Sequence, residues 1–394
     1  MLQLSFVNFR KDSFLLVEGK AVSDRFYIIQ VGRVRCFKEV MASPEEQSFL
    51  GPGDFVGVIP CMSGHNQIES VVALTDVVAI SVRRDQYTEL IQKNTPVALK
   101  IIRTFANKMR LLNDTLTRLT LKNSAVSSPE HLFSVASYYE KAGMIDPAIY
   151  AYYQYLKACP HGANVENAKR RFIVLKPRSH AVYFEPPADP IRTYPKNTMV
   201  FCEDQSGQDM FIIQEGQIKI SKVVEGNEVI LAVLKKGEFF GEMALLENMP
   251  RSASAIAFED CRLMTVNRQN FNQMVTTQAS LIAKLTTTLA ERLWSMSRQL
   301  ANTQIPDPLH KLFDMLALQL EKSRVQCAAG YPYNFDLSPT DLANMCGIPQ
   351  EQQAQCLHQF MTDPRIRLEN NKITVPDTLE IVKSAAFYRK QAHA

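Results

Sequence analysis

The sequence lacks the features of several large protein classes. Its 394 residues contain no run of about 18 consecutive apolar residues, so no membrane-spanning helix is predicted. The start has no basic stretch followed by an apolar one, so we expect no cleaved signal peptide. The eight cysteines include no Cys-x-x-Cys pair and no zinc-like spacing with histidine, and the net charge is only +4. We therefore expect a cytoplasmic protein with reduced thiols, no metal and no membrane partner.

Catalytic motifs are also missing. No paired carboxylates, no nucleophile with a matching base and no metal cluster fall within a common motif, so we predict no enzyme, no catalytic residue and no cofactor. At roughly 100–200 residues per domain, the length predicts two to four domains.

The sequence does contain an internal repeat. Residues 27–36 align with 211–220, and residues 53–57 align with 237–241, both at an offset of 184 residues. Because the offset is constant across some sixty residues, it predicts a duplicated module without insertions. Short alternating runs between turn residues favour a small antiparallel barrel or jelly roll in each copy.

Each copy is followed by apolar residues at helical spacing. One stripe lies between residues 99 and 119 and another between 282 and 300. The stripes either pack on their own barrels or form a seam between two long helices, 96–121 and 280–302. Such a seam would make the chain an intramolecular pseudo-dimer, and a homodimer through residues 280–302 is the alternative.

A run in the second copy has the features of a phosphate site. It reads Phe240-Gly-Glu-Met-Ala-Leu-Leu-Glu-Asn-Met-Pro-Arg-Ser-Ala-Ser254. Gly241 lets the backbone approach a ligand closely and opens a short helix. Arg251 supplies a cation with a fixed fork of donors, and Glu242 supplies a carboxylate suited to a neutral hydroxyl. These residues favour a singly charged phosphate beside a ribose-like hydroxyl.

This run resembles the phosphate-binding cassette of cyclic nucleotide-binding domains. The resemblance implies that Glu242 holds the ribose 2′-hydroxyl and that Arg251 pairs with the cyclic phosphate. It also implies supporting contacts from the hydroxyl of Ser252 and from the backbone of Gly241 and Ala244.

The first copy departs from this cassette at both charged positions. At the same offset, Val58 stands for Glu242 and Gln67 stands for Arg251. An anionic phosphate would be poorly compensated in such a pocket. We interpret the first copy as a structural or dimerising module, with binding of a less charged ligand as the alternative.

The long helix after the second copy supplies the expected contacts to the base. Trp294, the only tryptophan, is a base-stacking candidate together with Ser297, although a buried seam position explains Trp294 equally well. Cyclic AMP is the favoured ligand and cyclic GMP the alternative. We expect ligand binding to reposition this helix.

Residues 129–162 follow the pattern of one tetratricopeptide (TPR) repeat. Its apolar and small positions are filled, and a turn is expected at residues 143–146. A single repeat cannot bury both faces, so it must pack on a neighbour. We interpret it as a spacer between the barrels, and a groove for a protein partner is the alternative.

The last ninety residues predict a small helical domain with a hairpin. Ser338, Pro339 and Asp341 form a helix start, Gly347 a turn before the next helix, and residues 370–371 a hairpin turn. This pattern predicts a winged helix-turn-helix. With the barrel before it, the layout resembles the CRP/FNR family of cyclic-AMP-receptor-type transcription regulators from about residue 192 to 380.

That resemblance implies DNA binding, but the C-terminal segment is nearly neutral and so has little positive charge with which to bind DNA phosphates. Residues 350–360 contain no Lys or Arg, and residues 305–394 contain nine Lys and Arg against ten Asp and Glu. The candidate contacts to base edges and to DNA phosphates are Gln350, Gln352, Gln353, Arg365, Arg367 and Lys372. The alternative is that the winged helix and the TPR hairpin bind protein and not DNA.

The sequence therefore predicts an α+β multi-domain protein. It would comprise two cyclic-nucleotide-binding jelly-roll domains each followed by a long helix, a TPR-like helical hairpin and a C-terminal winged helix-turn-helix. The expected domain ranges are 1–125, 126–175, 176–304 and 305–394. The predicted function is a cyclic-nucleotide-responsive transcription regulator, and the alternative is a cyclic-nucleotide-gated protein-interaction module.

Overall fold

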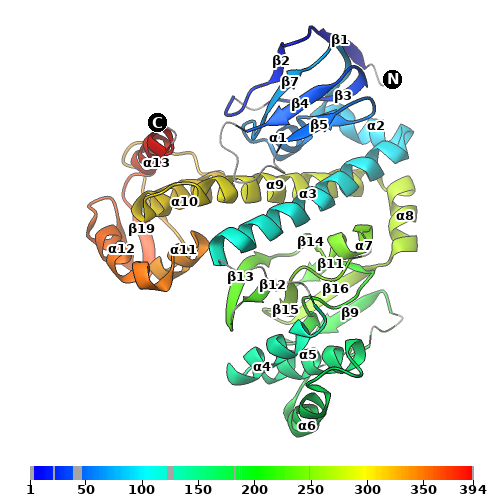
Figure 1. The fold of residues 1–394 in the computed structure, drawn as a ribbon, viewed down its shortest axis with the longest axis vertical. Helices are drawn as coiled ribbons and strands as arrows, with labels where there is room; N and C mark the ends of the chain where they lie inside the picture. The colour runs from blue at the N-terminus through cyan, green and yellow to red at the C-terminus, as the bar shows by residue number, and fades with distance from the viewer. Residues whose placement is uncertain are drawn as a thin grey trace. The chain divides into compact units, whose positions relative to one another are not determined.

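The chain forms two compact units (Figure 1). The computed structural model describes residues 4–20, 23–38, 47–121, 128–181, 183–185, 187, 189–224, 226–247 and 249–392. Unit 1 comprises Met1–Leu90, Leu111–Ser124 and Leu289–Ala394, and unit 2 comprises Ile91–Arg110 and Ala125–Thr288. Within the described ranges, no helix is long and apolar enough to cross a membrane.

The first barrel, in unit 1, consists of two four-stranded antiparallel sheets. Their strand orders are β1-β8-β3-β6 and β2-β7-β4-β5. Buried aliphatic residues of both sheets, including Ile29, Val34 and Val71, form the core between them. The strands are β1 Ser5–Phe9, β2 Phe14–Leu16, β3 Arg25–Val31, β4 Val34–Phe37, β5 Ser48–Leu50, β6 Phe55–Val56, β7 Ser70–Ala73 and β8 Val77–Arg83.

The second barrel, in unit 2, repeats this plan. Its sheets have the orders β14-β11-β16-β9 and β10-β15-β12-β13. Phe211, Ile213 and Leu263 belong to its buried core. The strands are β9 Ile191–Tyr194, β10 Met199–Phe201, β11 Met210–Glu215, β12 Ile218–Val224, β13 Asn227–Leu234, β14 Phe239–Phe240, β15 Ser254–Ala257 and β16 Cys261–Val266.

The strand register confirms the predicted duplication. Ile28 pairs with Ile80 in the first barrel, and the residues 184 positions later, Ile212 and Met264, pair in the second. The register also shifts at the same place in both, after Ile29 and after Ile213. One fold therefore serves both copies, with the predicted jelly-roll-like arrangement of two sheets.

One short helix lies between strands of each barrel, α1 in the first and α7 in the second, and further helices follow the strands. They are α1 Val58–Ser63, η2 Arg84–Gln86, α2 Tyr87–Lys93, α3 Thr95–Leu121, α7 Glu242–Glu247, α8 Arg268–Thr277 and α9 Ala279–Thr303. The two long helices α3 and α9 confirm the predicted spans. Each begins in unit 2 and ends in unit 1, with the change after residue 110 in α3 and after residue 288 in α9. Their pairing with each other remains a prediction.

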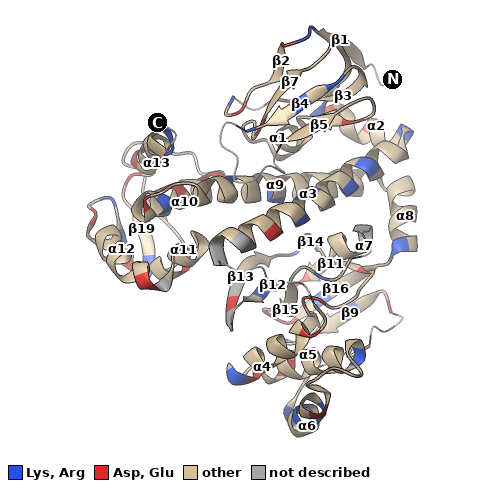
Figure 2. Cartoon of the chain, viewed as in Figure 1, with Lys and Arg blue, Asp and Glu red and all other residues tan. Residues whose placement is uncertain are grey.

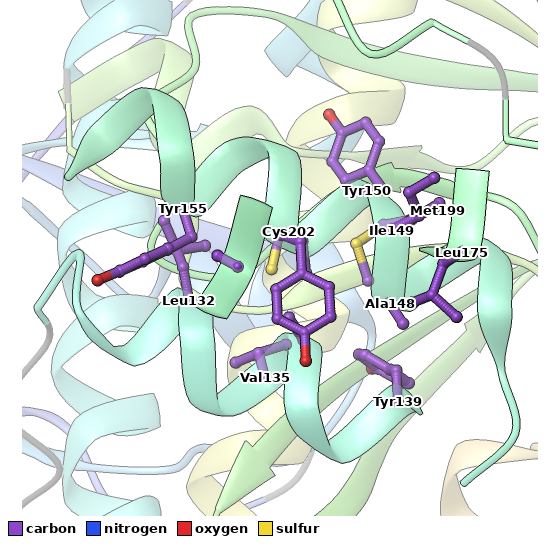
Figure 3. Packing of buried hydrophobic residues seen from close by; sticks show 14 of the residues in the cluster. Leu132, Val135, Tyr139, Ala148, Ile149, Tyr150, Tyr155, Leu175, Met199 and Cys202 are labelled. Carbon is purple, nitrogen blue, oxygen red and sulfur yellow. The ribbon is translucent and has the colours of Figure 1, made fainter. Parts of the chain in front are cut away.

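Helices α4 His131–Lys141 and α5 Ile145–Ala158 occupy the segment with the TPR pattern. The turn between them contains Gly143 at φ +74°, as expected. Figure 3 shows their buried face, where Tyr139 and Ile149 share a core with Met199 of the second barrel. A third helix, α6 Val165–Leu175, and the turn η3 Lys176–Arg178 follow, and neither was predicted. The helical hairpin thus buries one face against the second barrel.

The C-terminal part contains all the helices and strands that the sequence predicts there. The predicted elements are α10 Pro308–Lys322, α11 Pro339–Met345, α12 Gln350–Thr362, β18 Arg367–Glu369 and β19 Lys372–Val375. Two elements were not predicted, β17 Tyr333–Asn334 and α13 Thr378–Ala392. Ser338 caps α11 in a reciprocal capping box with Asp341. Asn370 and Asn371, at φ +52° and +61°, form the predicted turn between β18 and β19.

Candidate functional site

The cassette of the second barrel begins at a left-handed glycine. Strand β14 ends at Phe240, Gly241 has φ +76°, and α7 starts at Glu242. A Cβ atom on Gly241 would lie 2.6 Å from Arg251 Nη1 and 3.2 Å from the carbonyl oxygen of Asp209. Only glycine therefore combines this backbone angle with so close an approach of the arginine.

Arg251 is held inside the barrel, with 5% of its surface exposed. Its Nη1 donates to the carbonyl of Gly241 at 2.8 Å, and its guanidinium lies 4.2 Å from the ring centre of Phe201. Its backbone N–H donates to the carbonyl of Gln205 at 2.9 Å, and its own carbonyl accepts from the N–H of Asp204 at 2.8 Å. Arg251 is thus held in place by contacts of its guanidinium group and by hydrogen bonds of its backbone.

The electrostatics leave this cation under-compensated. Burial lowers the pKa of Arg251 to about 10, while Tyr150, Asp209 and Glu242 oppose that shift. Glu242 is itself only 2% exposed. Among the described residues, Arg251 Nε has no hydrogen-bond partner. A buried guanidinium with an unused donor suits an anionic ligand.

The remaining cassette candidates lie beside these residues. Ala244 is buried in α7, whereas Ser252 is half-buried, and its hydroxyl lies 3.8 Å from Met243 Sδ. The structure brings Gly241, Glu242 and Arg251 together as the resemblance implies.

Sequence reasoning missed Gly207 and Tyr150. A Cβ on Gly207 would lie 2.7 Å from Arg251 Nε, so this glycine makes room for the guanidinium. Tyr150 of α5 donates to Gln205 Oε1 at 3.2 Å and thus supports the segment that holds Arg251. The repeat contained one signal that could have identified Gly207. The first copy has Ser23 at the position of Gly207 and also has no arginine at the position of Arg251.

Trp294 and Ser297 lie in unit 1, beside the first barrel. Trp294 is 3% exposed and stacks on His65, with ring centres 3.7 Å apart. Ser297 is equally buried, and its hydroxyl has no hydrogen-bond partner among the described residues. Their contact with a base bound in the second barrel remains a prediction.

The candidate DNA contacts on α12 differ in their exposure. Gln352 is exposed, whereas Gln353 Nε2 donates to Asn344 Oδ1 at 3.0 Å and to the carbonyl of Ile348 at 2.8 Å. Gln350 begins the helix, and its side chain lies outside the described part of the structure. Helix α12 carries no Lys or Arg (Figure 2).

Two further glutamines on α12 were missed. Gln355 and Gln359 are exposed and lie three and seven positions after Gln352, so all three share one helix face. That spacing was present in the sequence and could have identified them.

The three cations near the hairpin are placed differently. Arg365 pairs with Asp363 at 2.6 Å, and its guanidinium lies 4.1 Å from the ring centre of Phe313. Lys372 forms an ion pair with Asp336. Arg367 is exposed at the start of β18. Arg365 and Lys372 are thus engaged with carboxylates of the C-terminal part itself, whereas Arg367 is exposed. Within the described ranges, no group of three or more His, Cys, Asp or Glu could hold a metal ion.

The comparisons with known proteins identify the domain type of the two barrels. Residues 6–94 and 191–278 match the cyclic nucleotide-binding domain. The fold and the cassette therefore define a protein with two cyclic nucleotide-binding domains.

The chain is also homologous to regulators of the cyclic AMP receptor protein family. It is 27% identical over 201 residues to the cyclic AMP receptor protein of Thermus thermophilus, covering 49% of this chain and 84% of that one. It is 23% identical over 193 residues to the CRP-like cAMP-activated global transcriptional regulator of Mycobacterium tuberculosis, covering 49% and 86%. Among solved structures, OCPA-complexed CprK is 20% identical with a TM-score of 0.40, covering 48% and 88%.

Proposed function

We propose that this protein is a transcription regulator that responds to a cyclic nucleotide, with cyclic AMP favoured over cyclic GMP. The observation that carries the proposal is the cassette of the second barrel. There a buried arginine with an unused donor, Arg251, and a buried carboxylate, Glu242, flank the left-handed turn at Gly241. The names of the relatives from Thermus thermophilus and Mycobacterium tuberculosis support the same function.

The cassette residues divide the recognition of the ligand. The cyclic phosphate accepts hydrogen bonds from the Arg251 guanidinium, whose Nη1 is otherwise bonded to a carbonyl and whose Nε has no partner among the described residues. The Glu242 carboxylate accepts from the ribose 2′-hydroxyl, and the Ser252 hydroxyl assists at the phosphate. Because a phosphate carries charge and a carbonyl does not, the ligand is the stronger partner for Arg251.

Helix α9 carries the signal to the C-terminal part. Its first residues group with the second barrel in unit 2, and its residues from 289 onward group with α10 to α13 in unit 1. A ligand that prefers one position of this helix shifts the population of that position. The base would favour one such position through contact with Trp294 and Ser297.

The C-terminal elements act as a winged helix-turn-helix. Helices α11 and α12 form the helix pair, and β18 and β19 form the wing. The exposed glutamines Gln352, Gln355 and Gln359 on α12 suit the donor and acceptor pattern of adenine edges. Arg367 is the wing cation best placed to meet a DNA phosphate.

Calorimetric titration of cyclic AMP and cyclic GMP into three forms of the chain tests the ligand. We expect one site per chain in the wild type, lost in Arg251→Leu and retained in Gln67→Leu, the matched change at the same repeat position. A charge-assisted hydrogen bond of about 1.5–3 kcal/mol corresponds to a loss of affinity of about 10- to 150-fold. Unchanged binding in Arg251→Leu, or no binding in any form, would contradict the proposal.

A mobility-shift titration on genomic DNA fragments tests the output. We expect a shift that requires the cyclic nucleotide and weakens as salt is raised, because phosphate contacts release counterions. The absence of any shift at low salt, with the nucleotide bound, would leave a regulator that acts through protein contacts.

A further inference from the structure

One sheet of the first barrel has an apolar outer face. In the sheet β2-β7-β4-β5, Phe14 pairs with Val72, and Val72 pairs with Arg35. Arg35 pairs in turn with Phe49. Directly opposed residues lie on the same face of a sheet, so these four residues form one row. The residues next to Arg35 and Val72 along their strands belong to the core on the other face. Phe14 and Phe49 are 53% and 64% exposed, so the row faces solvent.

Phe37 belongs to the same face, because it lies two positions after Arg35 on β4. Its ring centre lies 6.5 Å from that of Phe14 and 4.7 Å from Cζ of Arg35. Apolar side chains gathered in one exposed patch mark an interaction surface, whereas single exposed apolar residues do not. We call this patch the aromatic face, and it comprises Phe14, Arg35, Phe37, Phe49 and Val72.

The same face of the second barrel is covered by helices. There Met199 pairs with Ile256, Ile256 with Lys219, and Lys219 with Val233. The last three residues lie 184 positions after their counterparts in the aromatic face. Met199 and Ile256 are each 1% exposed, because both belong to the core that the second barrel shares with α4 and α5, where Figure 3 shows Met199. In one copy of the barrel, this face therefore binds a pair of helices.

The exposed copy of the face is more aromatic than the covered one. Phe37 and Phe49 stand where the second barrel has Ser221 and Val233. In the covered copy the Ser221 hydroxyl lies 3.3 Å from the hydroxyl of Tyr139 on α4. Exposure to water alone would favour polar side chains at such positions. The phenylalanine rings therefore suit a face that is buried against a partner.

The cation of the aromatic face has no counterion in the described part of the chain. Arg35 Nε has no hydrogen-bond partner among those residues, and none of their carboxylates pairs with it. In the covered copy, Lys219 pairs with Glu228 at 2.7 Å, and Glu228 also accepts from the hydroxyl of Tyr139 at 3.1 Å. A carboxylate thus lies between the cation and the helices there. For Arg35, a carboxylate of the partner would fill this role.

We propose that the aromatic face is a docking site for an amphipathic helical segment of another protein. The apolar side chains of that segment cover the three phenylalanines, and one of its carboxylates pairs with Arg35. This goes beyond the response to a cyclic nucleotide, because it gives the first barrel a partner protein of its own. The helices α4 and α5 occupy the equivalent face of the second barrel, so the two copies differ in what covers them.

Two labelled helical peptides test the proposal on the full chain. They share a leucine face, and one has glutamates on its polar face where the other has lysines. We expect a saturable rise in fluorescence anisotropy with the glutamate peptide and weaker binding of the lysine peptide. Arg35→Gln should reduce the difference between the two peptides, because it removes the charge that distinguishes them.

Variants locate the binding site. Phe14→Ser and Phe49→Ser should each weaken the binding of the glutamate peptide by about ten-fold or more, since buried aromatic anchors dominate such interfaces. Phe6→Ser is the matched control, because Phe6 is 68% exposed on β1 of the other sheet of the same barrel. It should leave the affinity unaltered, and circular dichroism shows that each variant is folded.

Three outcomes would overturn the proposal. One is that neither peptide binds, and another is that Phe6→Ser weakens binding as much as Phe14→Ser and Phe49→Ser do. The third comes from analytical ultracentrifugation of the chain alone. Self-association that is lost in Phe14→Ser and Phe49→Ser would assign the aromatic face to a second copy of this chain.

Discussion

Replacing Gly241 by alanine perturbs the cassette through a single methyl group. The new Cβ would lie 2.6 Å from Arg251 Nη1 and 3.2 Å from the carbonyl oxygen of Asp209. The backbone oxygen belongs to a strand-adjacent segment and moves little, so the guanidinium must shift. Its 2.8 Å hydrogen bond to the carbonyl of residue 241 is then lost, and with it the position from which Arg251 meets a phosphate.

The expected cost has two parts. Holding an alanine at φ +76° destabilises the folded chain by roughly 1–2 kcal/mol, whatever surrounds it. Displacing Arg251 removes a charge-assisted hydrogen bond to the ligand, worth about 1.5–3 kcal/mol, which corresponds to a loss of cyclic AMP affinity of about 10- to 150-fold.

Gly143→Ala is the matched control for Gly241→Ala. Gly143 lies in the same unit at φ +74°, and a Cβ there meets nothing within 4 Å. Urea unfolding should show a similar loss of about 1–2 kcal/mol in both variants, and calorimetry should show weaker cyclic AMP binding only in Gly241→Ala. Wild-type affinity in Gly241→Ala, or an equal loss of affinity in Gly143→Ala, would refute the argument.

Two further predictions concern the contact between the helical hairpin and the second barrel. Tyr150→Phe removes the hydroxyl that donates to Gln205 Oε1, and should lower the unfolding free energy by about 1 kcal/mol and weaken cyclic AMP binding, because Gln205 holds the backbone of Arg251. The Glu203 carboxylate, 3.7 Å from His131 Nε2, raises the pKa of His131, and burial raises that of Glu203, so the folded state holds protons more tightly than the unfolded state. The unfolding free energy should therefore fall as the pH rises from 6.5 through the raised pKa of His131, and His131→Ala should flatten this dependence in urea titrations at several pH values.

The duplicated barrel could be predicted because its signals are local. A turn glycine is needed at Gly32 and Gly216, each at positive φ where a Cβ would contact the carbonyl oxygen of Asp76 or Asp260. Such backbone requirements recur at a fixed offset and can be recognised without knowing the fold. The cap at Ser338 was predictable for the same reason, since its signal lies within four residues.

The contacts that complete each site could not be predicted, because they join segments far apart in sequence. Tyr150 reaches Gln205 across 55 positions, and Trp294 stacks on His65 from a different part of the chain. Periodicity places Trp294 on the buried face of a helix but does not say which barrel that face meets. From the sequence, Arg365 was likewise expected to be a cation of the wing that contacts DNA, and only the fold reveals its pairing with Asp363.

The two barrels show how one scaffold can keep its fold while the residues of its cassette change. In the second barrel the cation is intrinsic, because Arg251 belongs to the cassette and Gly207 leaves the space that it needs. In the first barrel Gln67 stands at the position of that cation, so the cassette there offers a neutral side chain. The cyclic nucleotide proposed for the second barrel would act on the C-terminal elements through α9, whose residues from 289 onward group with them in unit 1. On this account the charged residues of the cassette, and not the barrel fold, decide which copy responds to a cyclic nucleotide.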